Sequence, residues 1–280
     1  MRFTKMHGIG NDYIYINCLE QNVHNPEQLA VRMSRRHFGV GSDGLVLIQP
    51  SDVADFAMRM FNSDGTESEM CGNAVRCIGK YVYERGLTAK ERFTLMTGAG
   101  LKEVLLRLDG GKVRSVCVDM GSPELAPSRI PVSLSGDVVL GHRLEIGAGT
   151  TYAIHCVSMG NPHCVIFVRD PEDVDLSIWG PLIENHPIFP NRTNVEFTVV
   201  RDRGHIAVRT WERGAGETLA CGTGACAALV ASVLTGRVNR EAEVKLHGGT
   251  LKVTWSPDDN HVYQEGPAEF VFDGEWPDDE

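Results

Sequence analysis

A repeat with a fixed offset of 150 residues is the feature that most constrains how this 280-residue chain can fold. When the chain is aligned with itself at this offset, Cys71-Gly72 in "EMCGNAVRC" falls on Cys221-Gly222 in "LACGTGACA". No gap is needed over positions 10–102. Of these 93 positions, 14 are identical to their counterparts, where roughly 6 identities are expected by chance at typical residue usage. The repeat predicts two copies of one α/β unit.

Both copies contain the same order of predicted elements. The alternating segments "DFAMRMFN" and "HIAVRTWE" are typical of strands, and each is followed by a turn-rich stretch. A helix then runs from the Cys-Gly pair to Gly86 or Gly236, where a helix C-terminus favours a left-handed residue. Further strands follow in "RFTLMTGAG" and "LKEVLLRL", and in "EVKLHGG" and "TLKVTW". The segment "ACAALVASVL" is nearly all small or apolar, so we expect the second helix to be buried deep in its domain.

These elements predict an α/β fold of the α+β type with two pseudo-symmetric domains. In each domain a mixed, mainly antiparallel sheet wraps around a central helix, and we expect the active site in the cleft between the domains. The Pro- and Ser-rich segment "DMGSPELAPSRIP" marks the boundary, and the strand in "GPAEFVFDGEW" is expected to return to the first copy. The predicted domains are 1–119 with 267–280, which carries Cys71, and 120–266, which carries Cys221.

Charge and apolar patterning exclude two kinds of partner. The chain has 27 Lys and Arg against 37 Asp and Glu, a net charge of -10, and no basic stripe interleaved with aromatic residues, so we expect no nucleic-acid partner. The first residues, "MRFTKMHGIGND", do not resemble a signal peptide, and the longest apolar runs are too short to span a bilayer. We therefore expect no membrane partner and a cytoplasmic location.

The other motifs predict neither a metal nor an organic cofactor. The eight cysteines are expected to be reduced thiols, and their close pairs are five or six residues apart rather than in C-x-x-C motifs. The segment "GVGSDG" satisfies G-x-G-x-x-G but follows a predicted helix and precedes a predicted strand, the reverse of a dinucleotide site, so we interpret it as a turn. No Walker A motif is present, and nothing singles out a lysine for pyridoxal phosphate.

A thiol placed at a helix N-terminus has a definite chemistry. Unpaired N–H groups and a partial positive charge favour anions there, so a thiol ionises more easily and a carboxylate is bound. The glycine that follows lets a substrate approach the backbone closely. If the two copies pack about a pseudo-twofold axis, both helix N-termini face one cleft, and such geometry suits inversion of a carbon centre. One sulfur then removes a proton from one face while the other returns a proton to the opposite face.

Five motifs carry a resemblance to a known family. The segments "GIGNDYIYIN", "FNSDGTESEMCGNAVRC", "MGNPHCVIFV", "RTNVEF" and "WERGAGETLACGTGACA" are similar to those of diaminopimelate epimerase. The resemblance implies a cofactor-free epimerase with two pseudo-symmetric domains, which interconverts LL- and meso-diaminopimelate in the synthesis of lysine and peptidoglycan. It also implies a homodimer.

The same resemblance implies a set of site residues. Cys71 and Cys221 are the acid/base pair, and His163 with Glu212 tunes the two cysteines. The residues expected to bind substrate are Gly72 and Asn73 with Gly222 and Thr223 at the reacting centre, and Asn11, Asn62, Asn161, Asn194, Glu212 and Arg213 elsewhere.

The chain departs from some members of the family at two positions. Gly44 stands where they carry a glutamine that contacts substrate, and Phe272 stands where they carry a tyrosine at a dimer contact. The remaining cysteines, namely Cys18, Cys77, Cys117, Cys156, Cys164 and Cys226, are expected to be small buried hydrophobic residues.

Two alternatives stay open at this stage. A proline racemase-like enzyme also uses paired cysteines, but its first motif usually carries His after Cys-Gly, where this chain has Asn73. A related isomerase class replaces the first cysteine with a carboxylate, which Cys71 argues against. A non-catalytic binding protein on the same fold would not need both cysteines.

Overall fold

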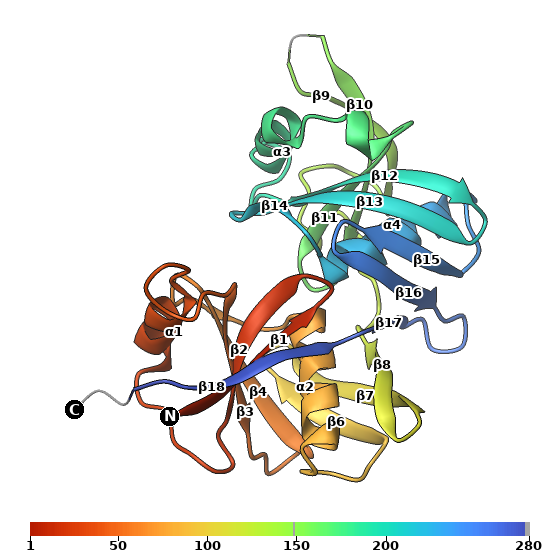
Figure 1. The fold of residues 1–280 in the computed structure, drawn as a ribbon. Helices are drawn as coiled ribbons and strands as arrows, with labels where there is room; N and C mark the ends of the chain where they lie inside the picture. Colours follow the sequence, from red (N-terminus) through yellow and green to blue (C-terminus); the bar gives the residue numbers. More distant parts are fainter. Residues whose placement is uncertain (148, 278–280) are drawn as a thin grey trace. The chain divides into compact units, whose positions relative to one another are not determined.

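The computed structural model describes residues 1–147 and 149–277, and the chain divides into two compact units (Figure 1). Unit 1 comprises residues 1–119 and 265–280, and unit 2 comprises residues 120–264. The sequence predicts the second boundary after residue 266, two residues later than in the structure, and residues 278–280 of the first predicted domain lie outside the described residues.

Unit 1 contains two helices and most of the N-terminal strands. Its helices are α1 (Pro26–Ser34) and α2 (Gly72–Glu84). Its strands are β1 (Arg2–Gly8), β2 (Asn11–Asn17), β3 (Gly44–Gln49), β4 (Phe56–Asn62), β5 (Glu67–Ser68), β6 (Arg92–Thr97), β7 (Gly100–Asp109), β8 (Lys112–Asp119) and β18 (Glu269–Glu275).

Unit 2 contains the same kinds of element. Its helices are α3 (Leu176–Glu184), α4 (Gly222–Leu234) and the short 3-10 helix η1 (Pro171–Asp173). Its strands are β9 (Val139–Glu145), β10 (Thr151–Ser158), β11 (Pro162–Phe167), β12 (Asn194–Asp202), β13 (His205–Glu212), β14 (Gly216–Thr218), β15 (Glu241–Leu246) and β16 (Gly249–Trp255). The boundary between units 2 and 1 falls within strand β17 (Val262–Gly266).

Strand pairing repeats between the two units. In unit 1, β2 and β3 are parallel, β3 and β4 antiparallel, β4 and β6 parallel, and β6 and β7 antiparallel. In unit 2, the same sequence of pairings runs through β11, β12, β13, β15 and β16. The tail strand β18 pairs with β1, as expected, and β9 takes the corresponding place beside β10. The predicted mixed sheet and the internal repeat are confirmed.

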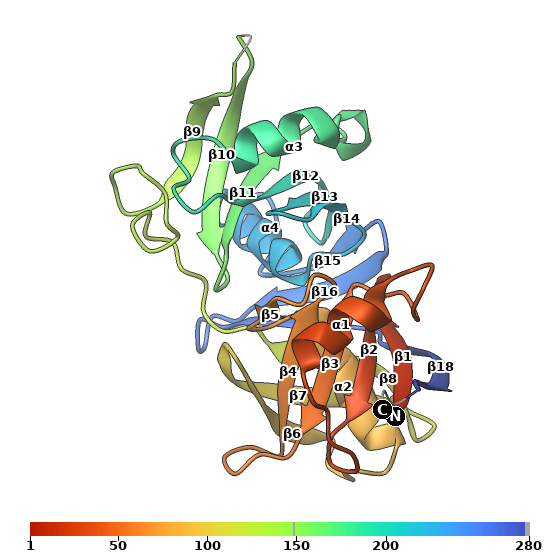
Figure 2. The same ribbon diagram turned by 90° about the vertical axis from the view of Figure 1, so that its left-hand side faces the viewer.

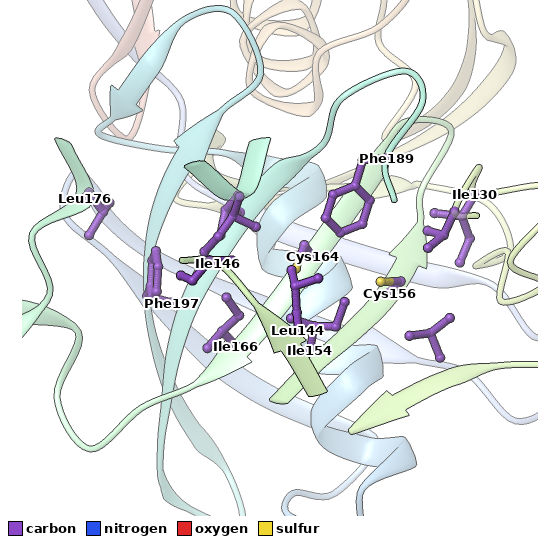
Figure 3. Packing of buried hydrophobic residues seen from close by; sticks show 14 residues of the cluster. Ile130, Leu144, Ile146, Ile154, Cys156, Cys164, Ile166, Leu176, Phe189 and Phe197 are labelled. Carbon is purple, nitrogen blue, oxygen red and sulfur yellow. The ribbon is translucent and has the colours of Figure 1, made fainter. Parts of the chain in front are cut away.

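A short helix covers one face of each sheet. Helix α1 contacts β3 and β4, and α3 contacts β12, β13 and β14 (Figure 2). In unit 2 the covered face forms an apolar cluster to which α3 contributes Leu176 and Ile183 (Figure 3). The strands contribute side chains such as Ile154, Ile166 and Phe197. Each short helix therefore covers a buried apolar face of its sheet.

The central helices α2 and α4 lie on the other side of the strands and are both buried. In α4 every residue from Gly222 to Ser232 is buried except Thr223, which confirms the prediction from its small and apolar residues. Helix α2 is buried equally far, from Gly72 to Val82, although it carries Arg76 and Lys80. Arg76 is fully buried because its guanidinium donates to Asn73 Oδ1 at 2.6 Å and to the backbone of Pro267 at 3.3 Å.

Helix α1 ends earlier than its apolar spacing predicts. The pattern in "PEQLAVRMSRRHF" predicts a helix to residue 38, but α1 ends at Ser34 and the next residue is extended. The backbone N–H of Gly41 donates to the Met33 carbonyl, and that of Ser42 donates to the Ser34 carbonyl. The chain turns back onto the helix C-terminus and satisfies its last carbonyl groups. The segment "GVGSDG" provides this turn, as predicted.

The two predicted glycine C-caps are present. Gly86 and Gly236 have φ values of 71° and 70°. Their N–H groups donate to the carbonyls of Tyr83 and Val233, and the next N–H groups donate to those of Val82 and Ser232. This pair of hydrogen bonds defines a Schellman motif, which ends both central helices at equivalent points.

Two further predictions concern the cysteines and the helices. The eight cysteines, all within the described residues, are free thiols, and Cys77, Cys156, Cys164 and Cys226 are buried. The expectation of full burial is wrong for Cys18 and Cys117, which are half-buried. Among the described residues, the helices are too short or too polar to cross a membrane.

The glycine caps lead to a stability prediction. Replacing Gly236 by Ala should lower the free energy of unfolding by about 1–2 kcal/mol, because an L-residue is strained at this φ value although no atom lies within 4 Å of the added Cβ. The measurement is urea denaturation followed by circular dichroism. Gly204→Ala is the matched control, since its φ lies outside the left-handed range and its Cβ would lie 3.7 Å from Asp202. Equal stability of the two variants would contradict the prediction.

Candidate active site

The two Cys-Gly pairs occupy equivalent positions at the N-termini of the buried helices. Cys71 is the N-cap residue of α2 and Cys221 that of α4, and both have extended backbone conformations. Gly72 and Gly222 are the first helical residues, so the N–H groups of each first turn have no partner within the helix. Each unit therefore places a sulfur beside a set of backbone donors that can bind an anion.

Gly222 is held by a buried amide. The side chain of Gln264 is fully buried, and its Nε2 donates to the Gly222 carbonyl at 2.7 Å. A Cβ at position 222 would lie 2.9 Å from this nitrogen. Glycine is required here because the amide anchors the helix N-terminus from so close a distance.

In unit 1, amide side chains surround Cys71. The thiol donates to Asn11 Oδ1 at 3.4 Å, and Asn73 Nδ2 donates to the same oxygen at 3.1 Å. Asn11 Nδ2 donates to Asp43 at 2.8 Å, and burial together with the nearby Asp12 raises the pKa of Asp43. The structure thus brings together Cys71, Asn11 and Asn73, three of the residues predicted from sequence.

In unit 2, hydroxyl, amide and carboxyl groups surround Cys221. Its side chain is buried, accepts the Gly224 N–H at 3.4 Å and lies 3.6 Å from Thr223 Oγ1. A hydrogen bond with Cys221 and one from Thr218 lower the pKa of Glu212, but burial is the larger effect and raises it overall. The structure brings together Cys221, Thr223 and Glu212, as the sequence predicts.

The expectation that a helix N-terminus lowers the thiol pKa is wrong for Cys221. Burial, followed by the negative charges of Glu212 and Glu196, raises the pKa of Cys221 well above its ordinary value. The hydrogen bonds from Thr223 and Gly224 act in the opposite direction but are weaker. Removal from water and two nearby carboxyl groups therefore outweigh the backbone donors, and Cys221 is a thiol at neutral pH.

His163 lies on β11 and is fully buried. Its Nε2 lies 3.0 Å from Asn161 Oδ1, and Asn161 Nδ2 donates to Thr223 Oγ1 at 3.2 Å. His163 is therefore connected to Thr223, beside Cys221, through one amide side chain. Its other ring nitrogen, Nδ1, lies 2.7 Å from Glu196 Oε1.

Glu196 is not among the residues predicted from sequence. It lies on β12 and is fully buried, and a Cβ at Gly224 would lie 2.8 Å from its Oε1 and 3.2 Å from Cys221 Sγ. One sequence signal could have revealed it, since Glu196 is the single charged residue in the otherwise apolar or neutral segment "NVEFTVV". A lone carboxylate in a buried strand needs a partner.

The other predicted residues lie at the ends of strands. Asn194 is buried, donates to the Pro162 carbonyl at 2.9 Å and accepts the Arg213 N–H at 2.9 Å. The exposed guanidinium of Arg213 donates to the Asn191 carbonyl at 2.9 Å. Asn62 Nδ2 donates to Thr66 Oγ1 at 3.0 Å.

Gly44 has no room for a side chain in this backbone. A Cβ there would lie 2.0 Å from the Phe61 carbonyl oxygen and 2.9 Å from the ring of Tyr13. The side-chain contact that a glutamine would make is therefore absent from this protein, and β3 and β4 pack closely instead.

The two units differ in the ionisable groups around their cysteines. At the repeat offset, Tyr13 corresponds to His163, Val46 to Glu196, and Asn62 to Glu212. The scaffold is repeated but these three side chains are not, so the carboxyl groups and the imidazole lie in unit 2.

The chain is similar to known proteins in both sequence and structure. The chain matches the family described as "Diaminopimelate epimerase" over residues 3–126 and 155–271. It is 56% identical over 275 residues to the diaminopimelate epimerase of Acetivibrio thermocellus, with 98% of each chain covered. It is 55% identical over 282 residues to that of Desulfovibrio desulfuricans, with 99% of this chain and 98% of the relative covered.

A solved structure with lower identity shares the fold. The hydroxyproline epimerase of Agrobacterium vitis, solved with trans-4-hydroxy-L-proline, superimposes with a TM-score of 0.71 at 15% identity. The alignment covers 98% of this chain and 91% of that chain. At this identity the similarity concerns the fold alone.

The environment of Cys221 leads to a prediction about its reactivity. Glu212→Gln should increase the rate of Cys221 alkylation by iodoacetamide at about pH 8 by at least about threefold, because a charge that raises the thiol pKa is removed and thiolate is the reactive form. The rate is measured by peptide mapping across a pH series. Glu217→Gln is the control, because Glu217 is exposed and pairs with Arg209 at 2.8 Å. An unchanged pH profile for Glu212→Gln would contradict the assignment.

Proposed function

The chain belongs to the diaminopimelate epimerase family, and we propose that it interconverts LL- and meso-diaminopimelate by proton transfer at one α-carbon, without a cofactor. The observation that carries the proposal is the equivalent placement of Cys71 and Cys221 as N-cap residues of the buried helices α2 and α4. Among the described residues, no other position of the repeat places a proton-transferring side chain at a helix N-terminus in both copies.

Inversion of the α-carbon requires two groups with different protonation states. One removes the proton from one face as a base, and the other donates a proton to the opposite face as an acid. Cys221 rests as a thiol because burial and two carboxyl groups raise its pKa, which suits the donor role. Cys71, whose thiol donates to Asn11 Oδ1 in this structure, is the group we assign as the base once it has lost that proton, and the roles are exchanged in the reverse reaction.

Negative charge develops on the substrate carboxylate as the proton leaves. The N–H groups that begin α2 and α4, at Gly72 and Asn73 and at Gly222 and Thr223, are the donors we assign to this charge. They are fixed by burial of the helices, so little reorganisation is needed during the reaction. His163 and Glu212 act on the protonation of the cysteines.

The part of the substrate that does not react also needs partners. We assign this role to Asn11, Asn62, Asn161, Asn194, Glu212 and Arg213. Arg213 is the fixed positive charge in this set, and a guanidinium pairs with a carboxylate through two parallel hydrogen bonds. Asn194 holds the backbone of Arg213, so it orients this side chain as well.

We further propose that the enzyme is a cytoplasmic homodimer with two domains, 1–119 with 267–280 and 120–266. Phe272 on β18 is 47% exposed and packs against Phe3 with ring centroids 6.0 Å apart, and Val271 beside it is 52% exposed. Such adjacent apolar side chains support a contact with a second copy. Sedimentation of the parent and of Phe272→Asp tests the oligomeric state.

The proposed activity has a direct test. The purified protein should convert LL-diaminopimelate to the meso isomer, and Cys71→Ala or Cys221→Ala should abolish the conversion, because each face needs its own proton carrier. In deuterated water the product should carry deuterium at the inverted carbon while unreacted substrate initially carries little. Separation of the stereoisomers and mass spectrometry measure both.

Cys18→Ala is the control for this experiment, since Cys18 is half-buried in unit 1 and burial raises its pKa to about 11. It should keep the parent activity. Near-normal turnover by either the Cys71 or the Cys221 variant would contradict the two-base mechanism, and rapid labelling of the substrate would indicate a single base.

Recognition of the distal carboxylate gives a separate prediction. Arg213→Met should lower kcat/KM for diaminopimelate at least tenfold, which corresponds to about 1.4 kcal/mol. Lysine, which lacks that carboxylate, should be a very poor substrate of the parent enzyme. Arg201→Met is the control, because Arg201 is exposed on β12 and lies 3.9 Å from Asp170. Equal turnover of lysine or proline would favour the racemase alternative.

A further inference from the structure

Glu184, the last residue of α3, is a buried carboxyl group to which the proposed mechanism assigns no role. A buried carboxyl group is costly unless it is paired and hydrogen-bonded. The C-terminus of a helix is also the end at which a negative charge is disfavoured. Neither burial nor the helix therefore favours a glutamate at this position, and the groups that surround its side chain must account for it.

Three donors from other segments converge on Glu184. Oε2 accepts the indole N–H of Trp211 at 2.7 Å, while Oε1 accepts the Gly214 N–H at 3.0 Å and Arg192 Nη1 at 3.0 Å. An indole N–H, a backbone N–H and a guanidinium can only donate. Glu184 is therefore the acceptor in all three hydrogen bonds, and the donors alone determine the direction of each one.

Two of these donors belong to the hairpin that carries Arg213. Strands β13 and β14 are joined by residues 213–215, and Arg213 is exposed in this short turn. Trp211 lies on β13 just before the turn, and Gly214 lies within it with a φ of 80°. Glu184 therefore holds the hairpin on both sides of Arg213.

The third donor connects Glu184 to the guanidinium of Arg213. Arg192 lies in the segment between α3 and β12, and the carbonyl of the preceding residue, Asn191, accepts Arg213 Nη1 at 2.9 Å. By pairing with Arg192, Glu184 holds this segment as well as the hairpin. One carboxyl group is thus connected to both the backbone and the charged end of Arg213.

The packing of Trp211 supports the same arrangement. Helix α3 contacts β13 and β14 (Figure 2), and Gly180 lies one turn before Glu184 on this helix. A Cβ at position 180 would lie 2.4 Å from the Trp211 ring. The ring can approach α3 because residue 180 has no side chain. The helix therefore provides both the space for the indole and the acceptor for its N–H.

We propose that Glu184 is a positioning residue for substrate recognition: it holds the Arg213 guanidinium in place to bind the distal carboxylate of the substrate. The proposal rests on the proposed function, which assigns that contact to Arg213. Glu184 acts through Arg213 and does not itself touch the substrate. Its effect on the reaction should therefore disappear when the guanidinium is removed.

Glu184→Gln tests the proposal with little change in side-chain size. One of the two terminal atoms becomes a donor, so the side chain can no longer accept all three hydrogen bonds. We expect kcat/KM for diaminopimelate to fall at least about tenfold, mainly through a higher KM, because Arg213 binds a part of the substrate that does not react. Steady-state kinetics measures both constants, and a loss confined to kcat would contradict the assigned role.

A double-mutant cycle separates this role from a general loss of stability. In an Arg213→Met background, Glu184→Gln should lower kcat/KM by less than about threefold, because the group that it positions is already absent. Equal losses in the two backgrounds would overturn the proposal. So would a parent-like kcat/KM for Glu184→Gln in the otherwise unchanged chain.

The matched control is Glu124→Gln. Glu124 Oε1 accepts the N–H groups of Leu125 and Ala126, both at 2.8 Å, and its Oε2 pairs with Arg129 at 2.6 Å. This glutamate therefore also accepts from backbone N–H groups and an arginine, but it lies outside the segments that hold Arg213. Its replacement should leave kcat/KM within about twofold of the parent value.

Hydrogen exchange tests the arrangement without substrate. The Gly214 N–H and the Trp211 indole N–H, followed by ¹H–¹⁵N correlation, should exchange at least about tenfold faster in Glu184→Gln than in the parent. Unchanged exchange would overturn the proposal. If the parent does not epimerise diaminopimelate but the exchange rates rise as expected, the proposed function is contradicted while the hold of Glu184 on the hairpin stands.

Trp211→Phe replaces Glu184→Gln in the cycle if the latter does not fold. It removes one of the three donors and keeps an aromatic ring beside Gly180. We expect a loss in kcat/KM of at least about threefold in the parent background and less than about twofold with Arg213→Met. Equal losses in both backgrounds would again overturn the proposal.

Discussion

Burial of an entire helix inside each unit is the constraint on which the rest of the structure depends. The N–H groups of the first turn of a helix have no partner within the helix. When the helix is buried, these donors need a partner at its N-terminal end. In both units the residue at that end is a cysteine followed by a glycine. The same burial that stabilises the fold therefore leaves backbone N–H donors beside a sulfur atom.

The two units satisfy this constraint with different residues. Helix α4 is made mostly of small and apolar residues, and its buried hydroxyl, that of Ser232, donates to its own helix backbone. Helix α2 buries Arg76 and Lys80 and must satisfy each of them with hydrogen bonds. Arg76 binds Asn73, and Asn73 binds Asn11, so the buried charge in unit 1 helps to hold the amides beside Cys71.

Divergence of the two copies gives the two cysteines different neighbours. In unit 1 the amides of Asn11 and Asn73 lie beside Cys71, and Asp43 accepts from Asn11 at 2.8 Å, whereas unit 2 places Glu212 and Glu196 near Cys221. Burial, followed by the charges of Glu212 and Glu196, raises the pKa of the Cys221 thiol. A repeated scaffold with unequal side chains thus gives the two sulfurs different surroundings, which is what the proposed two-base mechanism requires.

Much of the fold followed from local patterns in the sequence. The offset of 150 residues placed Cys71 and Cys221 at equivalent helix N-termini, and Gly86 and Gly236 marked the C-termini, because capping depends on residues close together in the chain. The return of the last strand to β1 was also predictable, since the second copy had no strand left to pair with it. The motifs around these elements were sufficient to identify the family.

Other properties were decided by tertiary structure alone. The sequence did not predict that α2 is buried, because the helix carries the charged residues Arg76 and Lys80. Both side chains donate to backbone carbonyls of residues distant in sequence. The raised pKa of Cys221 depends on burial and on carboxyl groups from β12 and β13, and the 2.7 Å contact between Glu196 and His163 joins residues from two different strands. Electrostatic effects act through space and become stronger as water is removed. The Cys-Gly motif therefore identifies the thiol but cannot determine its protonation state.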